Sequence, residues 1–134
     1  MEKRRKSTAE PLVRMCDSEE SRAVRDFLAK VGDKWSILVL VMLQKTPGHR
    51  ARFSEIQRMV RGISQRMLTT TLRDLERDGF VSREVFPEVP PRVEYELTSL
   101  GLGLMEPMQH LVDWIGGHWR AIHHARERFD QRTG

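Results

Sequence analysis

The sequence predicts a mainly α-helical fold that carries one small β-hairpin, and three observations favour this α+β class. Apolar residues recur at helical spacing through most of the chain from residue 19 onward. Two runs, Phe80–Phe86 and Val93–Leu97, instead alternate apolar with polar or charged residues at the period of a β-strand. The segment between them, residues 87–92, holds three prolines and is expected to form a stiff, protruding tip.

Length and composition predict a single soluble domain. The chain has 134 residues, of which 39% are hydrophobic and 31% are charged, as is typical of globular proteins. No apolar run approaches the roughly 18 residues that cross a bilayer, and the N-terminus has no apolar signal segment. A single cysteine cannot form an internal disulfide, which fits a reducing compartment, so we expect a cytoplasmic protein.

The first two helices are expected over residues 19–31 and about 34–43. Ser18 or Asp17 can cap the first helix, because a side-chain oxygen there accepts hydrogen bonds from amides of the first turn. Asp33 can cap the second helix in the same way. That second helix is apolar on nearly every side, so we expect it at the centre of the fold.

Two further helices follow, joined by a tight turn. A short strand is expected at residues 50–53, and Ser54 then begins a helix in which Gln57 completes a capping box. Gly62 closes this helix, and the next one starts almost at once and ends before Gly79. Two helices joined in this way have the signature of a helix-turn-helix, and the hairpin that follows makes the predicted fold a winged helix-turn-helix.

The second helix of this pair has one apolar and one polar face. Leu68, Leu72 and Leu75 form a stripe that faces the core. The polar side, with the Ser64 cap at its start, offers hydroxyl, amide and guanidinium groups, which belong to Ser64, Gln65, Arg66, Thr69, Thr70 and Arg73. Such groups bind phosphates and base edges, so we expect this face to contact a DNA major groove. Taken alone, the same pattern also fits an ordinary solvated helix face.

The hairpin is expected to act as the wing, which we interpret as basic. Arg92 lies near its tip, where a guanidinium can enter a flanking minor groove or contact the DNA backbone. The alternative is that Arg92 is an exposed turn residue without a DNA contact.

The N-terminal segment is expected to be separate from the domain. Residues 1–16 carry five Lys or Arg against two Glu, a net side-chain charge of 5 − 2 = +3. We expect a flexible basic arm, which either adds nonspecific DNA affinity or has no specific role. Residues 17–134 then form the winged-helix domain.

A long C-terminal helix, capped by Thr98, is expected to be the dimerisation helix at about residues 99–128. Pro107 lies in an early turn or causes a kink, and Gly116-Gly117 bends or splits the helix. Its main apolar stripe consists of Leu104, Met108, Leu111, Ile115, Trp119 and Ile122. One small domain does not need this much apolar surface, so we expect a homodimer whose N- and C-terminal helices cover it.

The motifs and their order resemble those of the HxlR-type winged-helix transcriptional regulators of bacteria, relatives of the MarR group. The resemblance covers roughly residues 22–120 and implies a dimer that binds near-palindromic operators with paired recognition helices. The matching segments are Gly32-Asp33-Lys34-Trp35, Arg52-Phe53-Ser54-Glu55-Ile56, Gly62-Ile63-Ser64, Leu75-Glu76-Arg77-Asp78-Gly79-Phe80-Val81 and Pro90-Pro91-Arg92-Val93-Glu94-Tyr95-Glu96-Leu97-Thr98.

The sequence departs from this family at two positions. Asp33 stands where members usually have a second glycine. Many members carry a redox-responsive cysteine about twelve residues before the Lys-Trp pair, where this chain has Arg22; its only cysteine, Cys16, lies six residues earlier. Cys16 is therefore either a redox-sensing thiol or an ordinary free cysteine in the arm, and we favour the second interpretation.

Other function classes fit the sequence less well. The chain has no glycine-rich phosphate loop and no nucleophile elbow, so we expect no enzyme. We expect no metal and no cofactor, because His118, His123 and His124 do not share one helix face.

We therefore expect a sequence-specific regulator, a repressor, that binds double-stranded DNA as a homodimer and answers an unknown small-molecule or redox effector. The alternative is a winged helix that docks a protein partner, against which the arginine face and the wing interpreted as basic argue.

Overall fold

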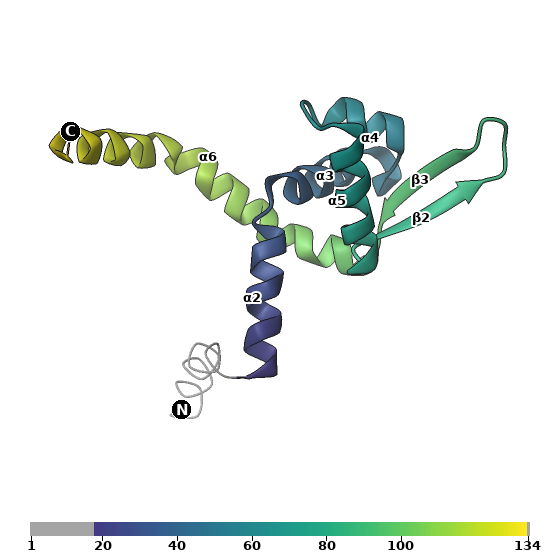
Figure 1. The fold of residues 1–134 in the computed structure, drawn as a ribbon, viewed down its shortest axis with the longest axis horizontal. Helices are drawn as coiled ribbons and strands as arrows, with labels where there is room; N and C mark the ends of the chain where they lie inside the picture. The colour runs from purple at the N-terminus through teal and green to yellow at the C-terminus, as the bar shows by residue number, and fades with distance from the viewer. Residues whose placement is uncertain (1–17, 134) are drawn as a thin grey trace.

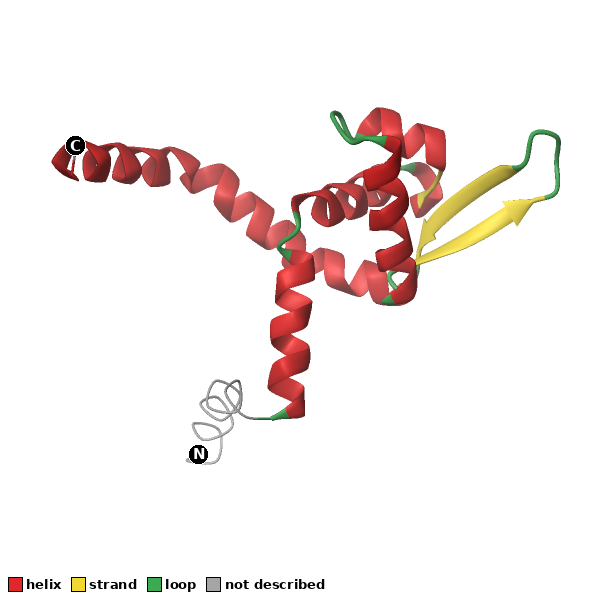
Figure 2. Cartoon of the chain, in the orientation of Figure 1, coloured by secondary structure: helices red, strands yellow, loops and turns green. Residues whose placement is uncertain are grey.

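A computed structural model describes residues 18–133 and confirms a mainly helical fold with a small antiparallel sheet (Figure 1). The predicted arm and Cys16 lie outside the described residues. The sheet has the strand order β1-β3-β2, and its β2–β3 hairpin projects from a body of helices (Figure 2). The elements are α2 (Glu19–Val31), α3 (Lys34–Lys45), η1 (Pro47–His49), β1 (Arg50–Arg52), α4 (Phe53–Met59), α5 (Gln65–Arg77), β2 (Val81–Phe86), β3 (Arg92–Leu97) and α6 (Ser99–Thr133).

Side chains cap the first two helices, as the sequence predicts. The Ser18 hydroxyl oxygen accepts a hydrogen bond from the Ser21 amide (3.0 Å). The Asp33 carboxylate accepts one from the Ser36 amide (3.3 Å). These bonds satisfy donors that have no partner within the helix, and so fix where each helix starts.

α3 is the central helix of the fold. Val39 and Leu43 are fully buried within it. The helix continues past its predicted end to Lys45, because the constraint that Pro47 imposes falls on the residue directly before it. Thr46 has an extended backbone (ψ 151°), as residues before proline prefer, and this ends the helix.

The start of α4 differs from the prediction. The helix begins at Phe53, and the Arg52 amide donates a hydrogen bond to the Glu55 carboxylate (2.9 Å). The expected capping box of Ser54 and Gln57 is therefore wrong. Pairing between β1 and β3 extends as far as Arg52, so the next residue is the first that can enter the helix.

The hydrophobic core joins α3, α4, α5, the sheet and the first turns of α6. Each large apolar side chain buried there contributes about 1.5–3 kcal/mol relative to exposure. Its fully buried apolar members are Val39, Leu43, Ile56, Leu68, Leu72, Val81 and Met105.

α6 is one continuous helix, and Gly116-Gly117 does not split it. Pro107 also lies inside the helix. The C-terminal half of α6 extends away from the helical body, as α2 does in another direction (Figure 1). Among residues 18–133, no helix is both long and apolar enough to cross a membrane.

Gly101 allows the first turn of α6 to approach the chain that leads into β2. A Cβ atom at this position would lie 2.2 Å from the carbonyl oxygen of Phe80, far inside van der Waals contact. Thr98 closes the same junction and confirms the predicted cap. Its hydroxyl accepts a hydrogen bond from the Gly101 amide (3.1 Å) and donates one to the Gly79 carbonyl (2.5 Å).

We expect Gly101→Ala to destabilise the domain by roughly 1–3 kcal/mol, the usual cost of forcing atoms into a packed interior. Gly103→Ala is the matched control, because a Cβ at Gly103 meets nothing within 4 Å. This second substitution should stabilise the helix by about 0.5–1 kcal/mol. Urea denaturation measures both effects, and equal midpoints for the two variants would contradict the close approach of α6.

Candidate nucleic-acid interface

The outward face of α5 is fixed by the start of the helix and by the residues that it buries. The Ser64 hydroxyl oxygen accepts a hydrogen bond from the Met67 amide (3.1 Å), which confirms the predicted cap. Leu68 and Leu72 are fully buried and Leu75 is 5% exposed, so the opposite side of the helix faces outward. The predicted DNA-binding residues of this helix are all exposed: Ser64, Gln65, Arg66, Thr69, Thr70 and Arg73.

The turn that precedes α5 is fixed by buried side chains on either side of it. Gly62 has a φ of +88°, a left-handed conformation that glycine adopts without the steric cost of a side chain. Val60 and Ile63 on either side of this turn are buried, at 2% and 6% exposure, and Ile56 anchors α4 in the same core. The angle between α4 and α5 is therefore set by packing.

Five exposed arginines occur on the helix-turn-helix, residues 53–77, and four of them precede the acidic residues Asp74 and Glu76 in the last turn of α5. Arg66 and Arg73 were predicted, whereas Arg58 in the last turn of α4 and Arg61 in the connecting turn were missed. None of the four has a carboxylate partner among residues 18–133. With one acidic residue between positions 53 and 73, the segment has a net charge of 4 − 1 = +3. The density of arginine on both sides of the glycine turn was the signal that could have identified the additional pair.

The two threonine hydroxyls of α5 already have partners. Thr69 Oγ1 donates to the Gln65 carbonyl (2.8 Å) and Thr70 Oγ1 donates to the Arg66 carbonyl (3.1 Å). Each oxygen can still accept a hydrogen bond from a base amino group. Donation to a phosphate requires the hydroxyl to rotate away from its backbone partner.

Arg92 does not lie free at the wing tip. It is the first residue of β3, and its side chain is 26% exposed. Its guanidinium pairs with Glu88 (2.7 Å) and Glu94 (2.8 Å) and lies 4.0 Å from the ring centroid of Phe86. The charge of Arg92 is therefore balanced within the wing, and contact with DNA requires it to leave both carboxylates.

The wing, residues 81–97, is acidic, and its interpretation as basic was wrong. It contains two arginines and four glutamates, a net charge of 2 − 4 = −2. Arg50 on β1 crosses the sheet and pairs with Glu94 (2.5 Å), Glu96 (2.7 Å) and Glu84. The hydrogen bond from Arg50 is the main cause of a lowered pKa at Glu94, and these glutamates raise the pKa of Arg50 in return.

The histidines of α6 do not gather into a metal site. His118 stacks on Trp114 at a centroid distance of 4.2 Å, and His124 lies 3.5 Å from Glu127. In the described part of the chain, no group of three His, Cys, Asp or Glu side chains is placed to hold a metal ion.

We expect Arg50→Met to destabilise the sheet at neutral pH, because it removes the cation shared by three glutamates. A carboxyl whose pKa is lowered on folding stabilises the folded state above its ordinary pKa, and this stabilisation disappears as the pH falls through the lowered value. The difference from wild type should therefore shrink below about pH 4, where glutamates protonate.

Arg83→Met is the control, because its nearest carboxylate, Glu76, is 3.8 Å away. Denaturation at several pH values measures the difference, and carbon-detected titration follows Glu94 directly. A destabilisation by Arg50→Met that persists unchanged in acid would contradict the electrostatic account.

Comparison with known proteins agrees with this geometry. The pattern that defines the HxlR-like helix-turn-helix family matches residues 30–123. An uncharacterized HTH-type transcriptional regulator of Methanothermobacter thermautotrophicus is 46% identical over 100 residues, which are 75% of this chain and 74% of that protein.

Solved structures agree as well. A candidate transcriptional regulator, ytfH of Salmonella typhimurium, superposes with a TM-score of 0.69 at 38% identity, covering 78% of this chain and 90% of its own. The reduced form of the redox regulator HypR gives a TM-score of 0.67 at 36% identity, with coverages of 75% and 97%. The chain therefore belongs to the HxlR-like family of helix-turn-helix transcriptional regulators.

Proposed function

We propose that this regulator is a homodimeric repressor that binds a near-palindromic operator with two α5 helices in successive major grooves. The exposed arginine, glutamine and hydroxyl face of α5, opposite its buried leucines, carries this proposal. A two-fold dimer matches a palindrome, because each protomer meets one half-site about one helical turn from the other. Occupation of such a site in the cytoplasm blocks access of the transcription machinery to the DNA.

The side chains of α5 divide into base readers and phosphate contacts. Arg66 and Arg73 can bridge the O6 and N7 atoms of guanine, and Gln65 can pair with adenine. Hydroxyls at the helix start, such as Ser64, position the protein on the backbone. We assign Arg92 a contact with flanking DNA only after it has left its two glutamates.

Dimer formation is supported by the apolar surface that one protomer leaves uncovered. Leu111, Ile115 and Trp119 are 47%, 45% and 53% exposed on the part of α6 that extends from the body. Met108 is 5% exposed and Leu104 packs against the same core, so both serve their own protomer. We propose that the seam begins at Leu111 and continues past the half-buried Ile122, with exposed apolar residues of α2 beside it.

A protein-docking role for the winged helix is the competing proposal. The acidic wing favours this role, but a protein-docking role does not explain why the arginines of the helix-turn-helix have no carboxylate partner in the described part of the chain. Salt dependence separates the two, because release of counterions from DNA gives a steep fall in affinity with salt.

The first test concerns base reading. Arg66→Ala or Arg73→Ala should each weaken binding to operator fragments recovered with the protein from its own genome by about 1–3 kcal/mol, the value of a bidentate guanine contact. Arg128→Ala removes the same charge near the far end of α6 and should have little effect (Figure 1). Unchanged operator affinity in both α5 variants would exclude this helix as the reader.

The second test concerns assembly. Leu111→Glu should give a folded monomer, because Leu111 is half-exposed in the protomer, whereas a charge in the seam costs several kcal/mol. Val89→Glu, at a fully exposed wing position, is the matched control and should remain dimeric. Sedimentation measures the assembly, and circular dichroism verifies the fold. An intact Leu111→Glu dimer would remove this part of α6 from the seam.

The third test concerns Cys16. The similarity to the redox regulator HypR favours a redox response. The acidic residues that follow Cys16 in the sequence argue against it, because negative charge disfavours the reactive thiolate. We expect Cys16→Ser to retain operator binding and its response to the physiological signal. Operator affinity is measured before and after diamide in both proteins. A loss of binding in wild type that disappears in the serine variant would make this protein a one-cysteine redox sensor.

A further inference from the structure

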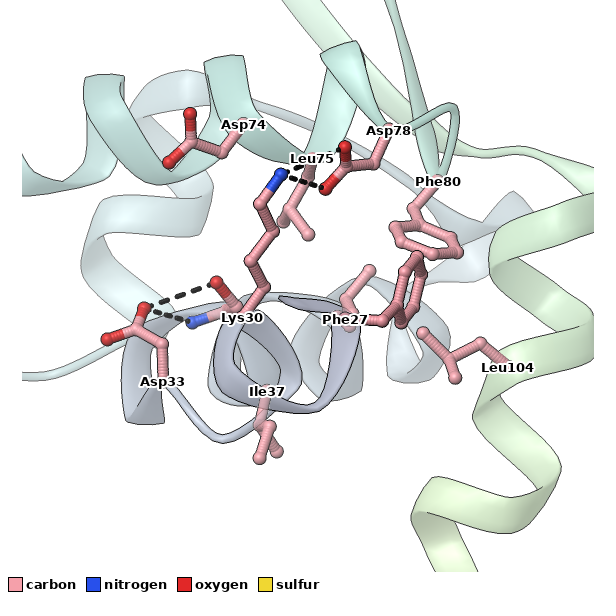
Figure 3. Close-up of a pocket in the computed structure, with 11 residues that line it drawn as sticks. Phe27, Lys30, Asp33, Ile37, Asp74, Leu75, Asp78, Phe80 and Leu104 are labelled. Carbon is pink, nitrogen blue, oxygen red and sulfur yellow. Dashed lines mark hydrogen bonds and ion pairs between the residues drawn. The ribbon is translucent and has the colours of Figure 1, made fainter. Parts of the chain in front are cut away.

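A cavity of about 110 Å³ lies where α2, α3, α5 and α6 meet (Figure 3). The rings of Phe27 and Phe80 meet edge-to-face at one side, with centroids 5.2 Å apart. The other apolar walls are formed by Ile37, Leu40, Leu75 and Leu104. A cavity that encloses benzene measures about 150 Å³, so this smaller one encloses a branched alkyl group or part of a small ring.

The rim of the cavity is acidic. It carries three carboxylates, Asp33, Asp74 and Asp78, and one ammonium, Lys30, a net charge of 1 − 3 = −2. Two of the carboxylates are engaged: Asp33 accepts from the Ser36 amide and hydroxyl, and Asp78 pairs with Lys30 at 3.2 Å.

Asp74 is the carboxylate that remains available. It is exposed, and it has no hydrogen-bond or ion-pair partner among the described residues. It lines the same cavity as Asp78, one helical turn away on α5, and Figure 3 shows the Lys30 ammonium between the two residues. A cation above the apolar walls would therefore meet one unengaged carboxylate and a second for which it competes with Lys30.

We propose that this cavity binds a small amphipathic amine. The protonated amino group displaces the Lys30 ammonium from its place between Asp74 and Asp78, and the apolar body packs on Phe27 and Phe80. The net negative rim disfavours an anionic ligand. A neutral ligand of the same shape gains the apolar contacts but not the charge-assisted hydrogen bonds, which are about twice as strong as neutral ones.

The position of the cavity couples this ligand to DNA binding, a step that rests on the proposed function. Lys30 belongs to α2, and Asp78 is the C-terminal cap of the recognition helix. An ammonium at Asp78 competes with Lys30 and weakens the link between α2 and α5. The amine then favours the arrangement in which this link is open, and operator affinity falls.

Binding is tested first on the full-length protein without DNA, with benzylamine as the probe and benzyl alcohol and benzoate as controls of the same shape. Calorimetry should show binding in the order benzylamine, benzyl alcohol, benzoate. Equal affinities for the three probes, or tighter binding of benzoate, would overturn the proposal. Failure of benzylamine to bind would do so too, and would show that the cavity closes or is filled by a second copy of the chain.

Three variants identify the site. Asp74→Asn should weaken benzylamine binding by up to about fivefold, the upper value for an exposed ion pair, and should leave benzyl alcohol unchanged. Lys30→Met should strengthen it, because Asp78 loses its competitor. Asp26→Asn, an exposed carboxylate of α2 outside the cavity, should change nothing. Equal effects of Asp74→Asn and Asp26→Asn would overturn the assignment.

Operator affinity with and without benzylamine then tests the coupling. A decrease that is absent in Asp74→Asn supports it. If benzylamine binds the wild-type protein without changing operator affinity, the coupling is refuted, whereas the proposal of an amine-binding site stands. A protein that binds no DNA at all refutes the proposed function, while the result for the cavity remains valid.

Discussion

The burial of one face of α5 against the core is the constraint on which the rest of the structure depends. Leu68 and Leu72 are fully buried, and removal of such a side chain to alanine costs about 2–5 kcal/mol. The helix therefore cannot rotate about its axis, and the Ser64 cap fixes where it starts. Residues on the opposite face take no part in the core, so they are free to be chosen for an external partner. Stability and recognition are thus divided between two faces of one helix.

The distribution of paired and unpaired arginines separates the helix-turn-helix from the wing. The five arginines of the helix-turn-helix have no carboxylate partner within the described chain, whereas Arg50 and Arg92 are each paired with at least two glutamates. An unpaired guanidinium can neutralise a phosphate without first breaking an ion pair. The charge that attracts DNA is therefore concentrated on the helix-turn-helix, and the wing contributes mainly a stiff sheet whose Arg92 is already paired with glutamates.

The sequence predicted those parts of the fold and site that depend on neighbouring residues. Helix caps at Ser18, Asp33 and Ser64 were correct, because each acts on an amide two or three residues away. The cap of α4 was not, since it depends on how far β1 pairs with a strand more than forty residues later. Arg92 was misplaced for the same reason. The alternation of side chains along β3 puts Arg92 on the same face as Glu94. That Glu94 also pairs with Arg50 can be known only from the register between β1 and β3.

The contact between α2 and the C-terminal end of α5 affects how the recognition helix is positioned. α2 is joined to the end of the recognition helix by the Lys30–Asp78 pair and by the contact of Phe27 with Phe80. Elsewhere it remains open, with Leu28 58% exposed. In a dimer built on α2 and α6, the separation of the two α5 helices is therefore set by this junction as well as by the seam. Half-sites lie about 34 Å apart along DNA, and a small rotation at the junction is magnified over that distance. Under the proposed function, a ligand of only a few atoms bound at this junction would change operator affinity, because the junction connects the recognition helix to the helices that set the spacing of the dimer.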